Sequence, residues 1–254
     1  MATAQTIDAI WTLHRAGNHF PKDWIGKLSL RDAYEVQQGI LKRRLAAGAR
    51  QSGWKIGFTA DGVRKMFGAT APVFGYLLEE GLKPSGHEFS LQALGSAMVE
   101  SEVLVILGKD LRGPGVTAAQ ARAAIREIAP AFEIITRRGD PKVDVSLAVA
   151  DNVMHTAYVV GLPRPLEPGE DLGDVRVEAL VNGQVGETVL GKQAMDNPID
   201  SVAWLANSLA PLGGSLKAGQ VILTGTFTKP PAAKAGDAFE SRFSGLGKVT
   251  TKFN

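Results

Sequence analysis

The pattern of apolar and polar positions predicts a helical N-terminal portion. Apolar side chains recur at helical spacing over residues 4–16, and Gly17 can end that helix. Ser29 followed by Asp32 resembles a capping box, and a second apolar stripe at helical spacing starts there. We therefore expect helices to dominate residues 1–50.

Short apolar runs dominate the remainder of the chain, so we expect it to be rich in β-strands. Asn182-Gly183 favours a tight hairpin between two of these runs. The main exception is a helix that opens at Pro198 and carries its apolar side chains on one face. The strands expected from this pattern are 175–181, 184–189, 220–227 and 240–253. We interpret residues 1–254 as a single domain, with a helical portion over 1–50 and a β-rich portion over 51–254.

Two glutamates interrupt the apolar run Met98–Leu107, which otherwise reads as a buried strand. Alternate side chains of a strand share a face, so Glu100 and Glu102 lie on the face that carries Leu104 and Ile106. Burying two carboxylates together costs several kcal/mol unless a cation compensates them. A divalent cation that prefers oxygen ligands is the simplest compensation, and an exposed strand end with two solvated acids is the alternative.

A third carboxylate lies in a similar setting. We expect a helix over 117–128, with Thr117 as its N-cap and Pro130 as its stop, followed by a short buried strand over 129–135. Glu133 stands alone among the apolar residues of that strand. Three such glutamates on two strands are typical of a metal site that keeps positions open for water and substrate.

The composition and charge of the chain exclude some kinds of site and give no support for others. The chain has no cysteine, which excludes disulfides and thiolate metal sites. Its formal net charge of +2, without a basic stretch interleaved with aromatic residues, gives no reason to expect nucleic-acid binding. We find no apolar run of membrane-spanning length and no signal peptide, so we expect no membrane association and a cytoplasmic protein.

A lysine stands out in the segment Gly53–Thr59. Lys55 lies between Trp54 and Ile56, and the flanking glycines allow close approach of a ligand. Near a metal and an apolar wall, the pKa of Lys55 can be lowered, so that the side chain exchanges protons. The alternative is a lysine that extends its ammonium group to solvent at a sheet edge.

Taken together, these segments resemble the 2-keto-4-pentenoate hydratase and 4-oxalocrotonate decarboxylase group of the fumarylacetoacetate hydrolase superfamily. The resemblance runs from about Asp32 to Phe253, and its short motifs are specific because they occur in this order. The matching segments are Gly53–Thr59, Val99–Glu102, Pro130–Ile135, Ala150–Asn152, Pro198–Leu209, Gly219–Gly225, Gly236-Asp237 and Gly245–Gly247.

The resemblance implies an α+β fold, a mixed β-sheet roll with outer helices, usually assembled into oligomers. It implies Mg²⁺ or Mn²⁺ held by three carboxylates, which here are Glu100, Glu102 and Glu133. Lys55 falls on the active-site lysine of the family. These implications agree with the metal site that the glutamate pattern predicts.

The resemblance also implies further site residues. Asp151 and Asn152 fall on the Ala-Asp-Asn motif, which implies catalytic positions that act near the metal or by shaping the site. The positions implied to bind substrate are Thr59, Arg138, Thr224 and Gly225, of which the last two match contacts to the substrate carboxylate.

The sequence departs from the family pattern at three places. Val73 stands where many hydratases have an aspartate, which removes a candidate base for water and favours the decarboxylase branch. Arg137 is added beside Arg138. Met154-His155 replaces a pair of serines, and His155 is either a new acid/base group or a structural, hydrogen-bonded histidine.

We therefore expect a metal-dependent lyase acting on 2-hydroxy-2,4-dienoate or 2-keto-enoate acids from meta-cleavage of aromatic compounds. The first expectation is a hydratase that adds water to the 2-keto-3-enoate, and the alternative is a 4-oxalocrotonate-type decarboxylase. A C–C hydrolase ranks lower because no His–Glu pair for water activation is evident. A non-catalytic partner subunit is the remaining alternative. The expected partners are a small anionic keto acid and further subunits, in a homo-oligomer or a hydratase–decarboxylase complex.

Overall fold

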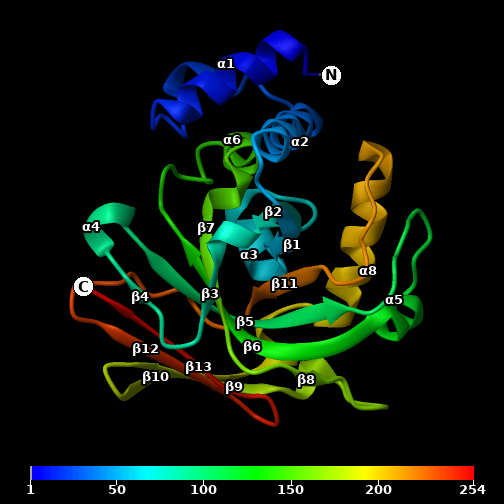
Figure 1. The fold of residues 1–254 in the computed structure, drawn as a ribbon, viewed down its shortest axis with the longest axis vertical. Helices are drawn as coiled ribbons and strands as arrows, with labels where there is room; N and C mark the ends of the chain where they lie inside the picture. The colour runs from blue at the N-terminus through cyan, green and yellow to red at the C-terminus, as the bar shows by residue number, and fades with distance from the viewer. Residues whose placement is uncertain (1) are drawn as a thin grey trace.

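The computed structural model describes residues 2–254, which form two mixed β-sheets with helices packed around them (Figure 1). The main sheet has the strand order β2-β1-β11-β5-β6-β7-β3, and β8 pairs with β6 beside this path. Its strands are β1 (Gln51–Gly57), β2 (Val73–Leu78), β3 (Leu82–Pro84), β5 (Met98–Leu107), β6 (Ile125–Ile135), β7 (His155–Val160), β8 (Arg164–Pro165) and β11 (Val221–Thr226). The mixed fold expected from the sequence is confirmed.

The second sheet has the order β10-β9-β12-β13-β4 and lies below the main sheet in Figure 1. Its strands are β4 (Glu88–Phe89), β9 (Arg176–Val181), β10 (Gln184–Leu190), β12 (Ala238–Phe243) and β13 (Gly247–Phe253). The Asn182-Gly183 hairpin is present, and both turn residues have the positive φ that such a turn requires. The largest hydrophobic cluster includes residues of both sheets and of the long helix α8.

The helices begin close to the positions that their capping residues indicate. Thr3 caps α1, Ser29 caps α2 and Asn197 caps α8, each through its side chain. The helices are α1 (Ala4–Arg15), α2 (Leu30–Ala46), α3 (Asp61–Phe67), α4 (Leu91–Leu94), α5 (Ala118–Ala124), α6 (Val145–Ala150), α7 (Gly191–Ala194) and α8 (Pro198–Leu209). Short 3₁₀ turns are η1 (Lys22–Trp24), η2 (Glu79–Gly81), η3 (Asn152–Met154), η4 (Leu172–Asp174) and η5 (Ala210–Leu212).

The helix expected over 117–128 is wrong over its last four residues, 125–128. A capping box between Thr117 and Gln120 starts α5, but the helix ends at Ala124 and β6 begins at the next residue. Pairing of β6 with β5 overrides the local preference for helix. Pro130 lies within β6, where the strand changes its second partner from β8 to β7, so its missing N–H is tolerated there.

Helices α1 and α2 lie together over α6, at the top of Figure 1. Their contacts form a separate hydrophobic cluster that includes Ile10, Val36, Val73 and Val153. The buried side chain of Gln37 joins this layer to the sheet, because its Nε2 donates to the carbonyls of Phe74 and Val149 at 2.9 and 2.8 Å. The helical layer is thereby bonded to β2 and to the end of α6.

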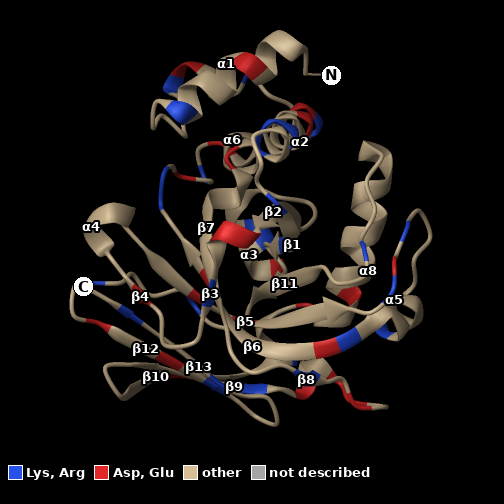
Figure 2. Ribbon diagram, viewed as in Figure 1, with Lys and Arg blue, Asp and Glu red and all other residues tan. Residues whose placement is uncertain are grey.

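Acidic and basic residues are interspersed along the chain, as Figure 2 shows. Within the described residues, no helix is long and apolar enough to cross a membrane.

Candidate metal and active site

The three glutamates singled out in the sequence come together on one face of the main sheet. Glu100 is the register partner of Glu133 across β5 and β6, and Glu102 is two residues along β5 on the same face. One carboxylate oxygen from each lies within 4.8 Å of the others. Glu102 and Glu133 are fully buried, whereas Glu100 is partly exposed. The cluster is therefore open on the side of Glu100.

Two oxygens of this cluster have no hydrogen-bond partner among the described residues. Oε2 of Glu102 accepts from the backbone N–H of Gly225 at 2.8 Å, but its Oε1 is buried without a partner. Oε2 of Glu133 is buried in the same way. Unpaired buried carboxylate oxygens are costly, and three carboxylates are the ligands that a hard divalent cation prefers. The donor set and its orphaned atoms therefore fit such an ion.

Gly225 reaches Glu102 because β11 is irregular at this point. The register with β5 shifts between Leu223 and Thr226, and Gly225 has a φ of 110°. A Cβ atom at this glycine would lie 2.2 Å from Oγ1 of Thr59, so only glycine fits. Thr59 is therefore packed against the strand segment that binds Glu102.

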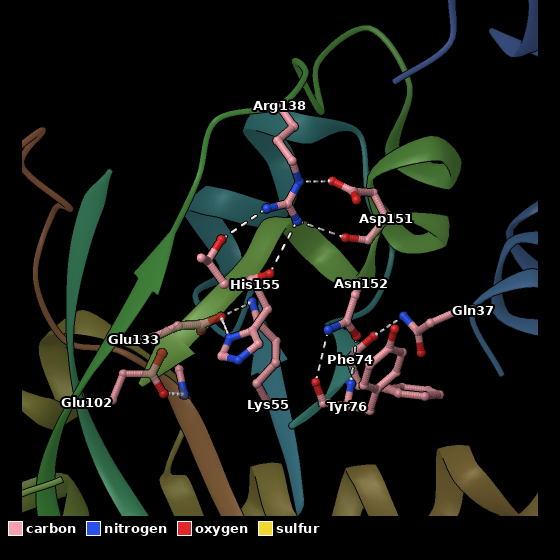
Figure 3. Close-up of polar contacts among 12 residues, drawn as sticks. Gln37, Lys55, Phe74, Tyr76, Glu102, Glu133, Arg138, Asp151, Asn152 and His155 are labelled. Atoms are coloured by element: carbon pink, nitrogen blue, oxygen red, sulfur yellow. Dashed lines mark hydrogen bonds and ion pairs between the residues drawn. The ribbon is translucent and has the colours of Figure 1, made fainter. Parts of the chain in front are cut away.

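Lys55 extends from β1 into the carboxylate cluster, where its side chain is only 3% exposed. Its Nζ lies 3.2 Å from Oε1 of Glu133 (Figure 3). The alternative of a lysine that reaches bulk solvent is wrong. Burial by itself lowers the pKa of Lys55, but the nearby carboxylates, Glu133 above all, outweigh it and raise the pKa. The lowered pKa expected from the sequence is therefore not found in the metal-free protein.

His155 joins the cluster from the start of β7. Its Nδ1 lies 2.8 Å from the same Oε1 of Glu133 that Lys55 contacts, and its Nε2 is buried without a hydrogen-bond partner within residues 2–254. His155 and Glu133 thus form a pair that we did not expect from the sequence. This glutamate belongs to the carboxylate cluster, so the pair is not an independent water-activating group.

The charges of the cluster shift its pKa values in opposite directions. Burial and the charge of Glu133 raise the pKa of Glu100 to about 8, and burial with the same neighbour raises that of Glu102. Although burial opposes ionisation of Glu133, Lys55 and His155 lower its pKa. Burial lowers the pKa of His155. Glu133 is thus the ionised centre of the group.

Asp151 and Arg138 form a second group next to the first (Figure 3). The Nε of Arg138 donates to Oδ2 of Asp151 at 2.7 Å, and Nδ1 of His19 lies 2.9 Å from the other oxygen. His14 lies close to these residues. His14 and His19, to which we gave no role from the sequence, therefore anchor the N-terminal segment at the site. No local motif marks this contact, because 132 positions separate His19 from Asp151.

The polar side-chain atoms of Asn152 and Thr224 form hydrogen bonds with backbone groups. The amide of Asn152 both accepts from the N–H of Tyr76 and donates to its carbonyl, at 2.7 and 2.9 Å. The hydroxyl of Thr224, fully buried, donates to the carbonyl of Val103 at 2.7 Å. Of the two roles that the Ala-Asp-Asn motif implied, these contacts favour shaping of the site for Asn152.

Comparison with known proteins identifies the family of this chain. The family model for the fumarylacetoacetate (FAA) hydrolase C-terminal region matches residues 68–254. A 2-hydroxyhexa-2,4-dienoate hydratase from Comamonas testosteroni is 36% identical over 230 residues, which covers 89% of this chain and 87% of the relative. A 4-oxalocrotonate decarboxylase from Pseudomonas putida is 31% identical over 242 residues, covering 95% and 90%.

A solved structure shares the whole fold. The 4-oxalocrotonate decarboxylase from Pseudomonas putida G7, complexed with magnesium and adipate, superimposes with a TM-score of 0.93 at 30% identity, covering 100% of this chain and 99% of that one. The same enzyme has also been solved with calcium and acetate, with a TM-score of 0.92. The chain therefore belongs to the 2-keto-4-pentenoate hydratase and 4-oxalocrotonate decarboxylase group of the fumarylacetoacetate hydrolase superfamily.

Proposed function

We propose that this protein is a metal-dependent lyase acting on 2-hydroxy-2,4-dienoate or 2-keto-enoate acids from meta-cleavage of aromatic compounds, in the first place a hydratase. The observation that carries the proposal is the buried Lys55 ammonium against three carboxylates, two of which present unpartnered oxygens. The hydratases among its relatives support the same reaction class.

Glu100, Glu102 and Glu133 would hold the divalent ion, Mg²⁺ or Mn²⁺. The ion would act as a Lewis acid toward the carboxylate and the C2 oxygen of the substrate. The partial exposure of Glu100 leaves this side of the cluster open to a small anionic ligand. Magnesium and calcium in the related decarboxylase structures support a divalent ion.

Lys55 would move the proton. Its Nζ is held by Oε1 of Glu133 at 3.2 Å and is removed from bulk water. A positioned side chain of this kind gives or accepts a proton at the substrate carbon without competition from solvent. Oε1 of Glu133 contacts both the ammonium of Lys55 and the imidazole of His155. This oxygen therefore keeps the ammonium in place.

The second candidate is decarboxylation, and one observation favours it. A Cβ atom at Gly57 would lie 3.4 Å from Val73 Cγ2, 3.5 Å from Val153 Cγ1 and 3.6 Å from Lys55 Nζ, so two valines and the ammonium surround the same glycine. An apolar wall offers no base to activate water for hydration. Loss of carbon dioxide needs no such base.

We also propose roles for the remaining site residues. Thr59 and Gly225 would shape the side of the site next to Glu102. Because the hydroxyl of Thr224 donates its proton to Val103, it could accept a hydrogen bond only from a protonated substrate oxygen. Asp151 would act through Arg138 and His19, its two side-chain partners. Assembly into a homo-oligomer or a hydratase–decarboxylase complex completes the proposal.

The experiment supplies the purified chain and Mg²⁺ with 2-hydroxypenta-2,4-dienoate or 4-oxalocrotonate. Loss of diene absorbance and release of carbon dioxide are followed separately. Hydration of the dienoate supports the first candidate, and carbon dioxide release from 4-oxalocrotonate supports the second. Absence of turnover of both substrates by a magnesium-loaded, folded protein would favour a non-catalytic partner and contradict the proposal.

A further inference from the structure

The turn between α6 and β7 has an unusual backbone. Three successive residues other than glycine have left-handed conformations, with φ of 56° at Asn152, 52° at Val153 and 60° at Met154. L-amino acids avoid this region because Cβ approaches the following carbonyl, and the β-branched Val153 is the least suited to it. Such a run persists only where the surrounding structure holds it.

Two side chains hold this turn from opposite sides. Asn152 is paired with the backbone of Tyr76 through both ends of its amide. Arg138 spans the turn from the residue before it to the residue after it: Nη2 donates to the carbonyls of Asp151 and His155 at 3.3 and 3.2 Å. The Nε of Arg138 also donates to the carboxylate of Asp151, at 2.7 Å. The guanidinium thus connects the two ends of the turn.

The turn determines where His155 lies. The register of β7 against β6 shifts at this point, so that His155 rather than Thr156 pairs with Ile135. The extra residue brings His155 onto the face of Glu133, since paired residues of antiparallel strands share a face. Nδ1 of His155 and Oε1 of Glu133 are 2.8 Å apart, so the imidazole and the carboxylate share one hydrogen-bonded proton.

Most of the N–H donors of Arg138 already have partners in the protein, so few remain to bind a substrate. Nη1 donates to Oγ1 of Thr156 at 3.0 Å, so four of the five N–H groups of Arg138 point to protein acceptors. The neighbouring Arg137 is exposed. The guanidinium of Arg138 therefore forms a forked set of hydrogen bonds within the protein, as a structural residue does, although the family resemblance implied a substrate contact.

We propose that Arg138 is a positioning residue, which holds the left-handed turn 152–154 and thereby keeps the imidazole of His155 on Glu133. The inference rests on the proposed function only where it concerns turnover. Its structural part, the dependence of the His155–Glu133 bond on Arg138, stands whatever the substrate is.

The structural part is tested by NMR on the full-length chain with ¹⁵N-labelled histidine. The Nδ1–H proton of His155 gives a downfield signal, assigned by its loss in His155→Gln. Arg138→Lys keeps the charge but cannot form the fork, so we expect the signal to broaden or vanish. Arg137→Ala, the matched control, should leave it unchanged. An unchanged His155 signal in both Arg138→Lys and Arg138→Ala would overturn the proposal.

Kinetics separate positioning from substrate binding. On each substrate that the wild type turns over, Arg138→Lys should lower kcat by about 10- to 100-fold, as loss of a supporting contact does. KM should change by less than about threefold. A KM raised about tenfold or more with an unchanged kcat would return Arg138 to the substrate-binding residues. A wild type without turnover would contradict the proposed function and leave the NMR result intact.

Relief of the backbone strain provides an independent check. Glycine adopts positive φ without penalty, so Met154→Gly makes the turn easier to hold. The loss of stability caused by Arg138→Lys, measured by urea unfolding, should then be smaller by about twofold or more in the Met154→Gly background, as expected for coupled sites. Equal losses in the two backgrounds would show that Arg138 does not act through the strained turn.

Discussion

Glu100 and Glu133 are direct register partners across β5 and β6, so two carboxylates face each other within a sheet. Like charges in this position destabilise a sheet, and here the third carboxylate of Glu102 lies beside them. Lys55 offsets only part of this charge, because one ammonium faces three carboxylates. The arrangement is stable with a divalent cation in place and costly without one.

Removal of one carboxylate ligand should therefore abolish the stabilisation by the metal ion without unfolding the protein. At a concentration one hundred times its Kd, Mg²⁺ should stabilise the wild type by about 2.7 kcal/mol. Glu102→Gln should lose activity and most of this gain, and its metal-free form should unfold at no lower temperature. Calorimetry with and without Mg²⁺ measures both. Glu127→Gln, on the same strand as Glu133 but paired with Arg126, is the control.

The contribution of Glu100 to the stability of the metal-free protein should fall as pH rises from about 4.5 to about 8. The folded-state pKa of Glu100 is raised to about 8, so the folded state binds more protons than the unfolded state in this window. Stability then decreases with pH, by an amount on the order of a few kcal/mol. Glu133, His14 and His155, whose pKa values are lowered, act in the opposite sense. They are present both in the wild type and in a Glu100→Gln variant, so a comparison of these two proteins isolates the effect of Glu100.

Urea unfolding of the metal-free wild type and Glu100→Gln at several pH values tests this dependence. The variant should lose less stability between pH 5 and 8. Mg²⁺ should bind the wild type more tightly at pH 8 than at pH 5, because the carboxylates must release protons to the solvent first. A wild type that gains stability across this range more steeply than the variant would contradict the expected sign.

Lys55→Ala should lower kcat by about 10²–10⁴, the usual range for removal of a general acid or base. KM should change much less, because the carboxylate cluster that would hold the ion remains. Lys65→Ala removes a lysine that is 77% exposed and should leave both constants unchanged. Steady-state kinetics on both substrates would contradict the role of Lys55 if its variant kept kcat within about threefold.

The carboxylate cluster could be predicted from the sequence because it follows from local rules. Glu100 and Glu102 share a face by strand periodicity, and Glu133 is conspicuous among apolar residues. The hairpin at Asn182-Gly183 and the capped helix starts followed in the same way. These features depend on neighbours in the chain.

The parts that escaped prediction depend on long-range pairing. The pairing of β6 with β5 determines where α5 ends. The sequence indicated a later end because Pro130 is a typical helix stop. The pair between His155 and Glu133 needs the register shift in β7 as well as proximity of the two strands. The contact of His19 with Asp151 joins segments with no common motif.

Our last prediction is that Val73 determines whether the protein favours hydration or decarboxylation. Val73 is 1% exposed, and its side chain and the Lys55 ammonium both lie beside Gly57, so a carboxylate at position 73 would have a cationic group nearby. If hydration is limited by the lack of a base for water, Val73→Asp should raise the rate of hydration of 2-hydroxypenta-2,4-dienoate by about tenfold or more, within the range of general-base catalysis.

Val73→Asn is the matched control for this substitution, because it has the size and polarity of aspartate without its charge. Thermal unfolding of both variants first establishes that they fold, since burial of a polar group costs stability. Faster hydration by Val73→Asp alone, with slower release of carbon dioxide from 4-oxalocrotonate, would assign the choice of reaction to this position. Fast hydration by the wild type without carbon dioxide release would contradict it, because a group other than residue 73, such as His155, would then have to activate the water.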